Sequence, residues 1–113
     1  MNIQIFGTKK CQDTRKAERY FKERNIKYQF IDMKEKGMSR GEFNSIKNSV
    51  GGIDCMINEK CKDTQLVTLM KYLSDYDKEE KLFENQQAVR TPVVRNGKTA
   101  SVGYCPDIWK EWK

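Results

Sequence analysis

The chain opens with a pattern typical of a β-α-β unit. Residues 3–5 alternate apolar and polar and are followed by Gly7, which predicts a short strand that ends in a loop. From about residue 12 to residue 24, apolar side chains recur at i, i+3 and i+4 and predict an amphipathic helix. Residues 28–31 are expected to form a second strand, and we expect the two strands to pair in parallel.

The middle of the chain, about residues 37–86, follows helical spacing. Ser39 and Glu42 fit a capping box, so a helix should begin there. Beyond a Gly-Gly break, apolar residues at i, i+3, i+4 and i+7 predict a second helix with a core-facing stripe. The stripe consists of Leu66, Leu69, Met70 and Leu73. A third helix is expected over about residues 77–84.

The last part of the chain returns to a strand pattern. Residues 92–95 and 99–102 flank Asn-Gly, the strongest short hairpin signal, so these strands should be antiparallel. A proline then opens a terminal helix. Its expected apolar side carries Ile108, Trp109 and Trp112.

This order of elements predicts an α/β fold in which a mixed four-stranded sheet with flanking helices carries the helical insertion. We expect one domain over residues 1–113, with a layout that resembles thioredoxin.

Composition excludes several classes of protein. The 113 residues carry 22 Lys and Arg against 16 Asp and Glu, a net charge of +6. Acidic and basic residues are interleaved and no nucleic-acid motif occurs, so the charge indicates a solvated surface and no DNA partner. No apolar run is long enough to cross a membrane, and no signal peptide is recognisable, so a cytoplasmic location is expected.

Histidine is absent, which removes Ser-His-Asp and Cys-His catalysis and leaves cysteine as the main candidate for chemistry. None of the four cysteines is spaced as C-x-x-C, so neither a zinc site nor another metal is expected. A disulfide scaffold is also disfavoured in a reducing compartment. No role is assigned to Cys55 or Cys61.

Cys11 follows the first strand and precedes the first helix, with Lys9, Lys10 and Arg15 close in sequence. A helix N-terminus and nearby cations both stabilise a thiolate, which is the nucleophilic form of cysteine. The same place would attract an oxyanion. A reactive thiol is therefore favoured over an inert, buried one.

Three segments together resemble the arsenate reductase (ArsC) family and its Spx relatives over nearly the whole chain. They are C-Q-D-T-R-K-A at residues 11–17, R-T-P-V-V at residues 90–94 and V-G-Y at residues 102–104. The resemblance implies a thioredoxin-like fold with a helical insertion and makes Cys11 the nucleophile. It also implies a cis bond before Pro92.

Departures from the family pattern bear on the activity. Spx-type regulators carry C-x-x-C, and here Thr14 replaces the second cysteine, so that disulfide cannot form. Arsenate reductases of the family surround the oxyanion with arginines. This chain has Thr91 before the proline, and Lys60 and Cys105 stand at the other two positions. Lysine does not reproduce the guanidinium fork.

The resemblance supplies the remaining candidate roles. Arg15, Lys60 and Arg90 are candidate anion contacts, and Thr14 could hydrogen-bond the thiolate. Thr91 and Pro92 could present backbone groups to a bound thiol. Cys105 is a candidate resolving thiol for Cys11, against the alternative of a small, partly buried residue near a helix start.

The expected function is that of a thiol-dependent oxidoreductase acting on an oxyanion or a glutathione mixed disulfide, without a bound cofactor. Glutathione, as co-substrate, or a glutaredoxin-like partner would complete turnover. One alternative is an Spx-like regulator that binds RNA polymerase without turnover. Another is a family member that keeps the fold and has lost catalysis.

Overall fold

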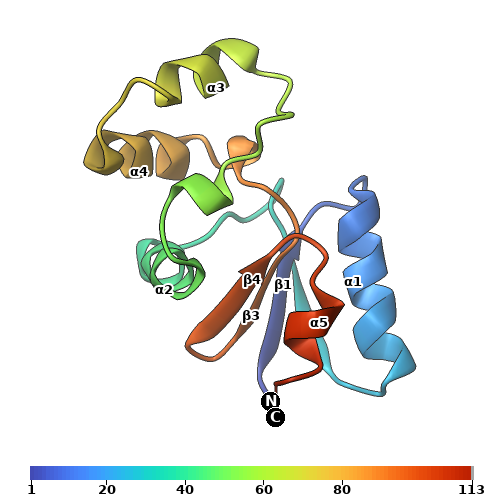
Figure 1. Ribbon diagram of the computed structural model, residues 1–113. Helices are drawn as coiled ribbons and strands as arrows, with labels where there is room; N and C mark the ends of the chain where they lie inside the picture. Colours follow the sequence, from blue (N-terminus) through green and yellow to red (C-terminus); the bar gives the residue numbers. More distant parts are fainter. Residues whose placement is uncertain (113) are drawn as a thin grey trace.

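The computed structural model describes residues 1–112 and contains every strand and long helix that the sequence predicts (Figure 1). In chain order the strands and α-helices are β1 Ile3–Gly7, α1 Gln12–Glu23, β2 Tyr28–Asp32, α2 Arg40–Val50, α3 Thr64–Met70, α4 Asp75–Glu84, β3 Val93–Asn96, β4 Thr99–Val102 and α5 Pro106–Trp109. Two short 3-10 helices that the sequence did not reveal join them, η1 Asp54–Met56 and η2 Gln86–Ala88. Residue 113 of the predicted single domain lies outside the described residues.

The four strands form one mixed sheet in the order β2-β1-β3-β4. β1 pairs in parallel with β2 and antiparallel with β3, and β3 and β4 form the predicted hairpin. Gly97 occupies the hairpin turn with a φ of 61°, a conformation that glycine adopts without steric cost. The mixed four-stranded sheet predicted from the sequence is therefore confirmed.

The two faces of the sheet pack against different parts of the chain. Successive side chains of a strand point to opposite faces, so Ile5 and Phe6 belong to separate apolar clusters. The Ile5 cluster includes Phe21 of α1 and Trp109 of α5, while the Phe6 cluster includes Phe43 of α2 and reaches into the insertion. In Figure 1, α1 and α5 accordingly lie on one side of the sheet and α2 on the other.

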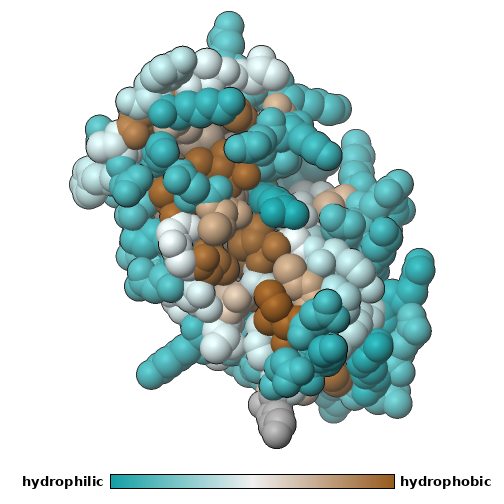
Figure 2. Space-filling model, viewed as in Figure 1, coloured by the Kyte–Doolittle hydropathy of each residue, from teal (hydrophilic) through white to brown (hydrophobic). Residues whose placement is uncertain are grey.

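The helical insertion begins with the predicted capping box. The backbone N–H of Glu42 donates to Ser39 Oγ at 3.2 Å, and the backbone N–H of Ser39 donates to Glu42 Oε1 at 2.9 Å. α2 packs along β4, where the backbone N–H of Ala100 donates to Ser49 Oγ at 2.8 Å. Helices α3 and α4 extend away from the sheet, and Figure 2 shows apolar surface between this lobe and the sheet.

Three details of the predicted helices are wrong. Leu69 is 46% exposed, because α3 ends after seven residues and buries only Leu66, Val67 and Met70. Leu73 lies beyond the end of α3 but is half-buried and packs against the core, as predicted. Ile108 is 46% exposed, because the one-turn helix α5 buries Trp109 alone.

The third detail concerns where α4 begins. The helix starts at Asp75, two residues earlier than expected, because Ser74 Oγ caps it by accepting a hydrogen bond from the backbone N–H of Asp77.

Within residues 1–112, none of the helices has the length and apolar composition needed to cross a bilayer. The same part of the chain contains no group of three or more acidic, cysteine or histidine side chains arranged to hold a metal ion.

Candidate active site

Cys11 lies in the loop between β1 and α1, immediately before the first residue of the helix. Its backbone N–H donates to Thr8 O at 3.2 Å, and its carbonyl oxygen accepts the helical hydrogen bond from Arg15 N at 3.2 Å. Thr14, on the first turn of α1, packs directly over Gly7, where any Cβ would overlap its side chain. The glycine that ends β1 thus allows the first turn of α1 to approach the sheet.

The second wall beside the thiol comes from the segment before β3. In the thiol form, Cys11 Sγ donates to the backbone oxygen of Thr91 at 3.7 Å, across 80 positions of sequence. The Thr91–Pro92 peptide bond is cis, as the family resemblance implied. Pro92 is buried behind Thr91, so Thr91 is the residue that faces the sulfur.

Burial and hydrogen bonding act on the pKa of Cys11 in opposite directions. Partial burial, the largest single influence, raises the pKa. Hydrogen bonds that the thiolate can accept from the side chains of Thr14 and Thr91 and from the backbone N–H groups of Thr14 and Asp13 lower it, and together they prevail. The pKa of the Cys11 thiol is therefore below its ordinary value, and the thiolate is favoured.

The hydroxyl of Thr14 is a buried hydrogen-bond donor for the Cys11 thiolate. Thr14 is completely buried, and its Oγ1 has no hydrogen-bond partner among the described residues. A buried hydroxyl without a partner is costly, and the thiolate of Cys11 is the acceptor that it lacks.

The source of the activation differs in one respect from the sequence prediction. The backbone N–H groups of the first helical turn contribute as expected, but Lys9, Lys10 and Arg15 are exposed and have no part in the pKa shift of Cys11. Solvent screening of exposed charges accounts for the difference.

A cavity of about 560 Å³ brings together four predicted site residues: Cys11, Lys60, Arg90 and Thr91. Its wall also includes side chains that sequence reasoning missed, namely Asp13, Asp54, Cys55, Ile57, Asn58 and Glu59. Three of these are carboxylates, of which Asp54 is already ion-paired with Lys78 at 3.0 Å. Most come from the insertion, and no local sequence signal places them beside Cys11.

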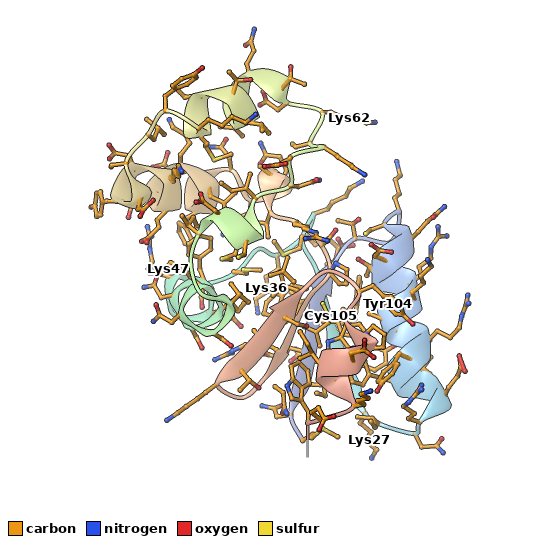
Figure 3. All side chains as sticks on the ribbon, viewed as in Figure 1. Lys27, Lys36, Lys47, Lys62, Tyr104 and Cys105 are labelled. Atoms are coloured by element: carbon orange, nitrogen blue, oxygen red, sulfur yellow. The ribbon has the colours of Figure 1, made fainter. Side chains whose placement is uncertain are left out.

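Other predicted residues lie away from this cavity. Arg15 is exposed on α1 and does not line it. Cys105, at the start of α5 (Figure 3), donates from Sγ to Val102 O at 3.3 Å and does not line it either. Burial raises the pKa of the Cys105 thiol, although the charge of Arg90 opposes this. A resolving role for Cys105 stays a prediction.

The side chain of Arg90 packs against Gly103, which leaves room for it. The residue faces Gly103, whose φ is 90°, and a Cβ built there would lie only 3.0 Å from Arg90 Nη2. The backbone N–H of Arg90 donates to Met56 O at 2.7 Å, which joins the segment before the cis proline to η1. Arg90 therefore borders both the Cys11 cavity and the surroundings of Cys105.

The sheet order, the flanking helices and the cis Thr91–Pro92 bond, whose Thr91 oxygen accepts from a cysteine at the start of α1, define a thioredoxin-like fold. The model of the ArsC family matches residues 6–112, and the chain belongs to this family.

Individual relatives cover the chain almost completely. The sequence is 25% identical to the global transcriptional regulator Spx 2 of Oceanobacillus iheyensis, over 100% of this chain and 94% of that protein. An ArsC family related protein from Bacteroides fragilis has a similar structure, with a TM-score of 0.88, 20% identity and coverage of 100% and 98%. An arsenate reductase from Vibrio cholerae gives a TM-score of 0.84 at 22% identity, with coverage of 98% and 97%. At these identities the two structures support the fold.

Proposed function

We propose that this protein is a thiol-dependent oxidoreductase that reduces mixed disulfides, with Cys11 as its nucleophile. The observation that carries the proposal is the environment of the Cys11 sulfur. The thiol borders an open cavity, and hydrogen bonds lower its pKa in spite of partial burial. A cysteine that is accessible and whose pKa is lowered is suited to attack another sulfur.

The reaction has two exchange steps. The Cys11 thiolate attacks the sulfur of a low-molecular-weight thiol, such as glutathione, in a mixed disulfide. A Cys11–sulfur bond forms, the substrate disulfide breaks, and the other sulfur leaves as a thiolate. A second molecule of the low-molecular-weight thiol then attacks the disulfide on Cys11, loses its proton, leaves as a symmetric disulfide and restores the thiolate. The cytoplasm, our proposed location, supplies such thiols.

The charges of the cavity favour a disulfide over an inorganic oxyanion as substrate. Asp13 and Glu59 line the same cavity as Lys60 and Arg90, together with Asp54, which is ion-paired with Lys78. Carboxylates at such a site oppose the binding of a multiply charged oxyanion, whereas disulfide exchange requires no concentrated positive charge. We propose that Lys60 and Arg90 instead contact a carboxylate of the bound thiol.

The remaining candidates have supporting roles in this proposal. Thr14 donates to the thiolate, and Thr91, held by the cis bond to Pro92, presents its side chain and backbone to the sulfur of the bound thiol. Arg15 lies outside the cavity and would act only at long range on an approaching anion.

Turnover with a glutathione mixed disulfide of a small thiol, followed as formation of oxidised glutathione, tests the proposal. Cys11→Ser should abolish turnover. Cys105→Ser should retain it, because the Cys105 thiol is directed to Val102 O and glutathione serves as the second thiol. Turnover by Cys11→Ser would contradict the proposal, and loss of turnover in Cys105→Ser would replace the one-thiol reaction by a two-thiol one.

A second candidate function is that of an Spx-like regulator that binds RNA polymerase without turnover. The whole-length similarity to Spx 2 favours it, although Thr14 removes the C-x-x-C pair. Specific retention of the protein by the C-terminal domain of the polymerase α-subunit, together with absence of turnover, would support this function. Absence of retention would count against it.

A further inference from the structure

A second and larger cavity adjoins the Cys11 site. It has a volume of about 1060 Å³ and shares Cys11, Asn58, Lys60 and Thr91 with the smaller cavity. The rest of its wall comes from the β1–α1 loop, the β2–α2 loop, the loop before α3, and the segment from α4 to Thr91. We call this larger cavity the lysine groove, after the four lysines that line it: Lys10, Lys34, Lys60 and Lys62.

The lysine groove is the positively charged side of the site. Its four lysines face only two carboxylates, those of Asp63 and Glu84. None of the four lysines forms an ion pair with any of residues 1–112. Asp63 Oδ1 also accepts a hydrogen bond from Leu66 N at 3.1 Å, which orients the carboxylate toward the first turn of α3. The wall of the groove therefore carries two more cationic than anionic side chains.

The groove also has an apolar component, and it is large for a small-molecule site. Met33, Phe83 and Val89 contribute to its wall. Pockets for small ligands commonly enclose about 300–1,000 Å³, and this groove, at about 1060 Å³, lies at the upper end of that range and continues into the adjoining cavity. An extended polypeptide with both apolar and acidic side chains fits such a surface better than a free low-molecular-weight thiol does.

Hydrogen bonds fix the positions of the loops that form the walls of the groove. The side chain of Gln86 forms two hydrogen bonds with the backbone of the β2–α2 loop. Its Oε1 accepts from Met38 N at 2.6 Å, and its Nε2 donates to Met38 O at 3.0 Å. On the other wall, Asn58 N donates to Ala88 O at 2.8 Å beside an antiparallel bridge between Ile57 and Val89. A groove formed in advance lowers the ordering cost of binding.

We propose that the lysine groove binds an acidic polypeptide segment whose cysteine is held in a mixed disulfide with a low-molecular-weight thiol. This inference rests on the proposed function and names its substrate class. With the polypeptide in the groove, Cys11 Sγ bonds to the sulfur of the low-molecular-weight thiol. The substrate disulfide breaks, and the polypeptide leaves as a thiolate.

Three matched peptides test the inference, each carrying glutathione on its one cysteine, with Glu, Gln or Lys as the flanking residues. The measurement is the rate of glutathione transfer to Cys11, followed by mass spectrometry. We expect transfer to be at least about tenfold faster from the acidic than from the basic peptide at low ionic strength, and the ratio to shrink as salt is added.

A double charge reversal, Lys34→Glu with Lys62→Glu, should lower that acidic-to-basic ratio at least about tenfold. The matched control is Lys27→Glu, which should keep the ratio. Lys27 lies at the opposite end of the molecule from Lys62 (Figure 3) and does not line the groove.

The outcomes separate the two proposals. Equal rates from all three peptides would overturn the groove inference and leave the proposed function standing. Absence of transfer from every peptide would overturn the proposed function, and the inference with it. The salt dependence of the unmodified protein is an independent test, because it does not require the double variant to fold.

Discussion

The pKa of Cys11 depends on individual donors around one sulfur atom. Burial alone would make the thiol less acidic, and the opposing hydrogen bonds come from the first turn of α1 and from Thr91. Of these donors, the hydroxyl of Thr14 is the one that is completely buried and lacks another partner in the described chain. A substitution at Thr14 can therefore change the reactivity of Cys11 without lowering the stability of the fold.

Replacement of Thr14 by valine keeps the shape of the side chain and removes the hydroxyl. The pKa of Cys11 should rise, so a smaller fraction is thiolate at neutral pH and alkylation slows. At mildly acidic pH, where the thiol is protonated, the free energy of unfolding should not fall, because an unsatisfied buried hydroxyl costs about 1–3 kcal/mol. Thr68→Val, on the exposed face of α3, is the control. An unchanged alkylation midpoint in Thr14→Val would contradict the assigned role.

Among the helices and strands, local sequence signals predicted most of the elements of the fold. Apolar periodicity located β1, α1 and β2, and the Asn-Gly turn defined the β3–β4 hairpin. The capping box marked the start of α2. Contacts between elements were harder to foresee. Leu69 and Ile108 have helical spacing but face solvent, because neighbouring elements determine which side of a short helix is covered.

The capping box of α2 is a stabilising element that can be tested directly. Ser39→Ala removes the acceptor for the Glu42 N–H and should lower the free energy of unfolding by about 1 kcal/mol, measured by urea denaturation. Ser45→Ala, inside the same helix, is the control and should cost less, because alanine has the higher helix propensity. Equal costs for the two variants would argue against the cap.

One part of the candidate site could be predicted from the sequence and another part could not. Motifs revealed Cys11 and the cis bond at Thr91–Pro92, because these features lie within short segments. The acidic wall at Asp54 and Glu59 was not foreseen, and neither was the lysine groove. Both depend on how the insertion folds back toward α1, which is a non-local contact without a sequence motif.

At the scale of the whole molecule, the site lies where the sheet, α1 and the insertion meet. Cys11 and Thr91 are 80 positions apart, and the segment that carries Thr91 is hydrogen-bonded through Arg90 to η1. The activation of Cys11 is therefore a property of the folded chain. Unfolding should remove the donors together and return the pKa of the thiol to its ordinary value.

Folding makes Cys11 an activated nucleophile. The most direct test is the pH dependence of Cys11 alkylation in a variant with Cys55, Cys61 and Cys105 replaced by serine, measured both folded and in urea. Because folding lowers the pKa of Cys11, the midpoint of the folded protein should lie below that of the unfolded chain. A folded midpoint equal to or above the unfolded one would contradict the claim.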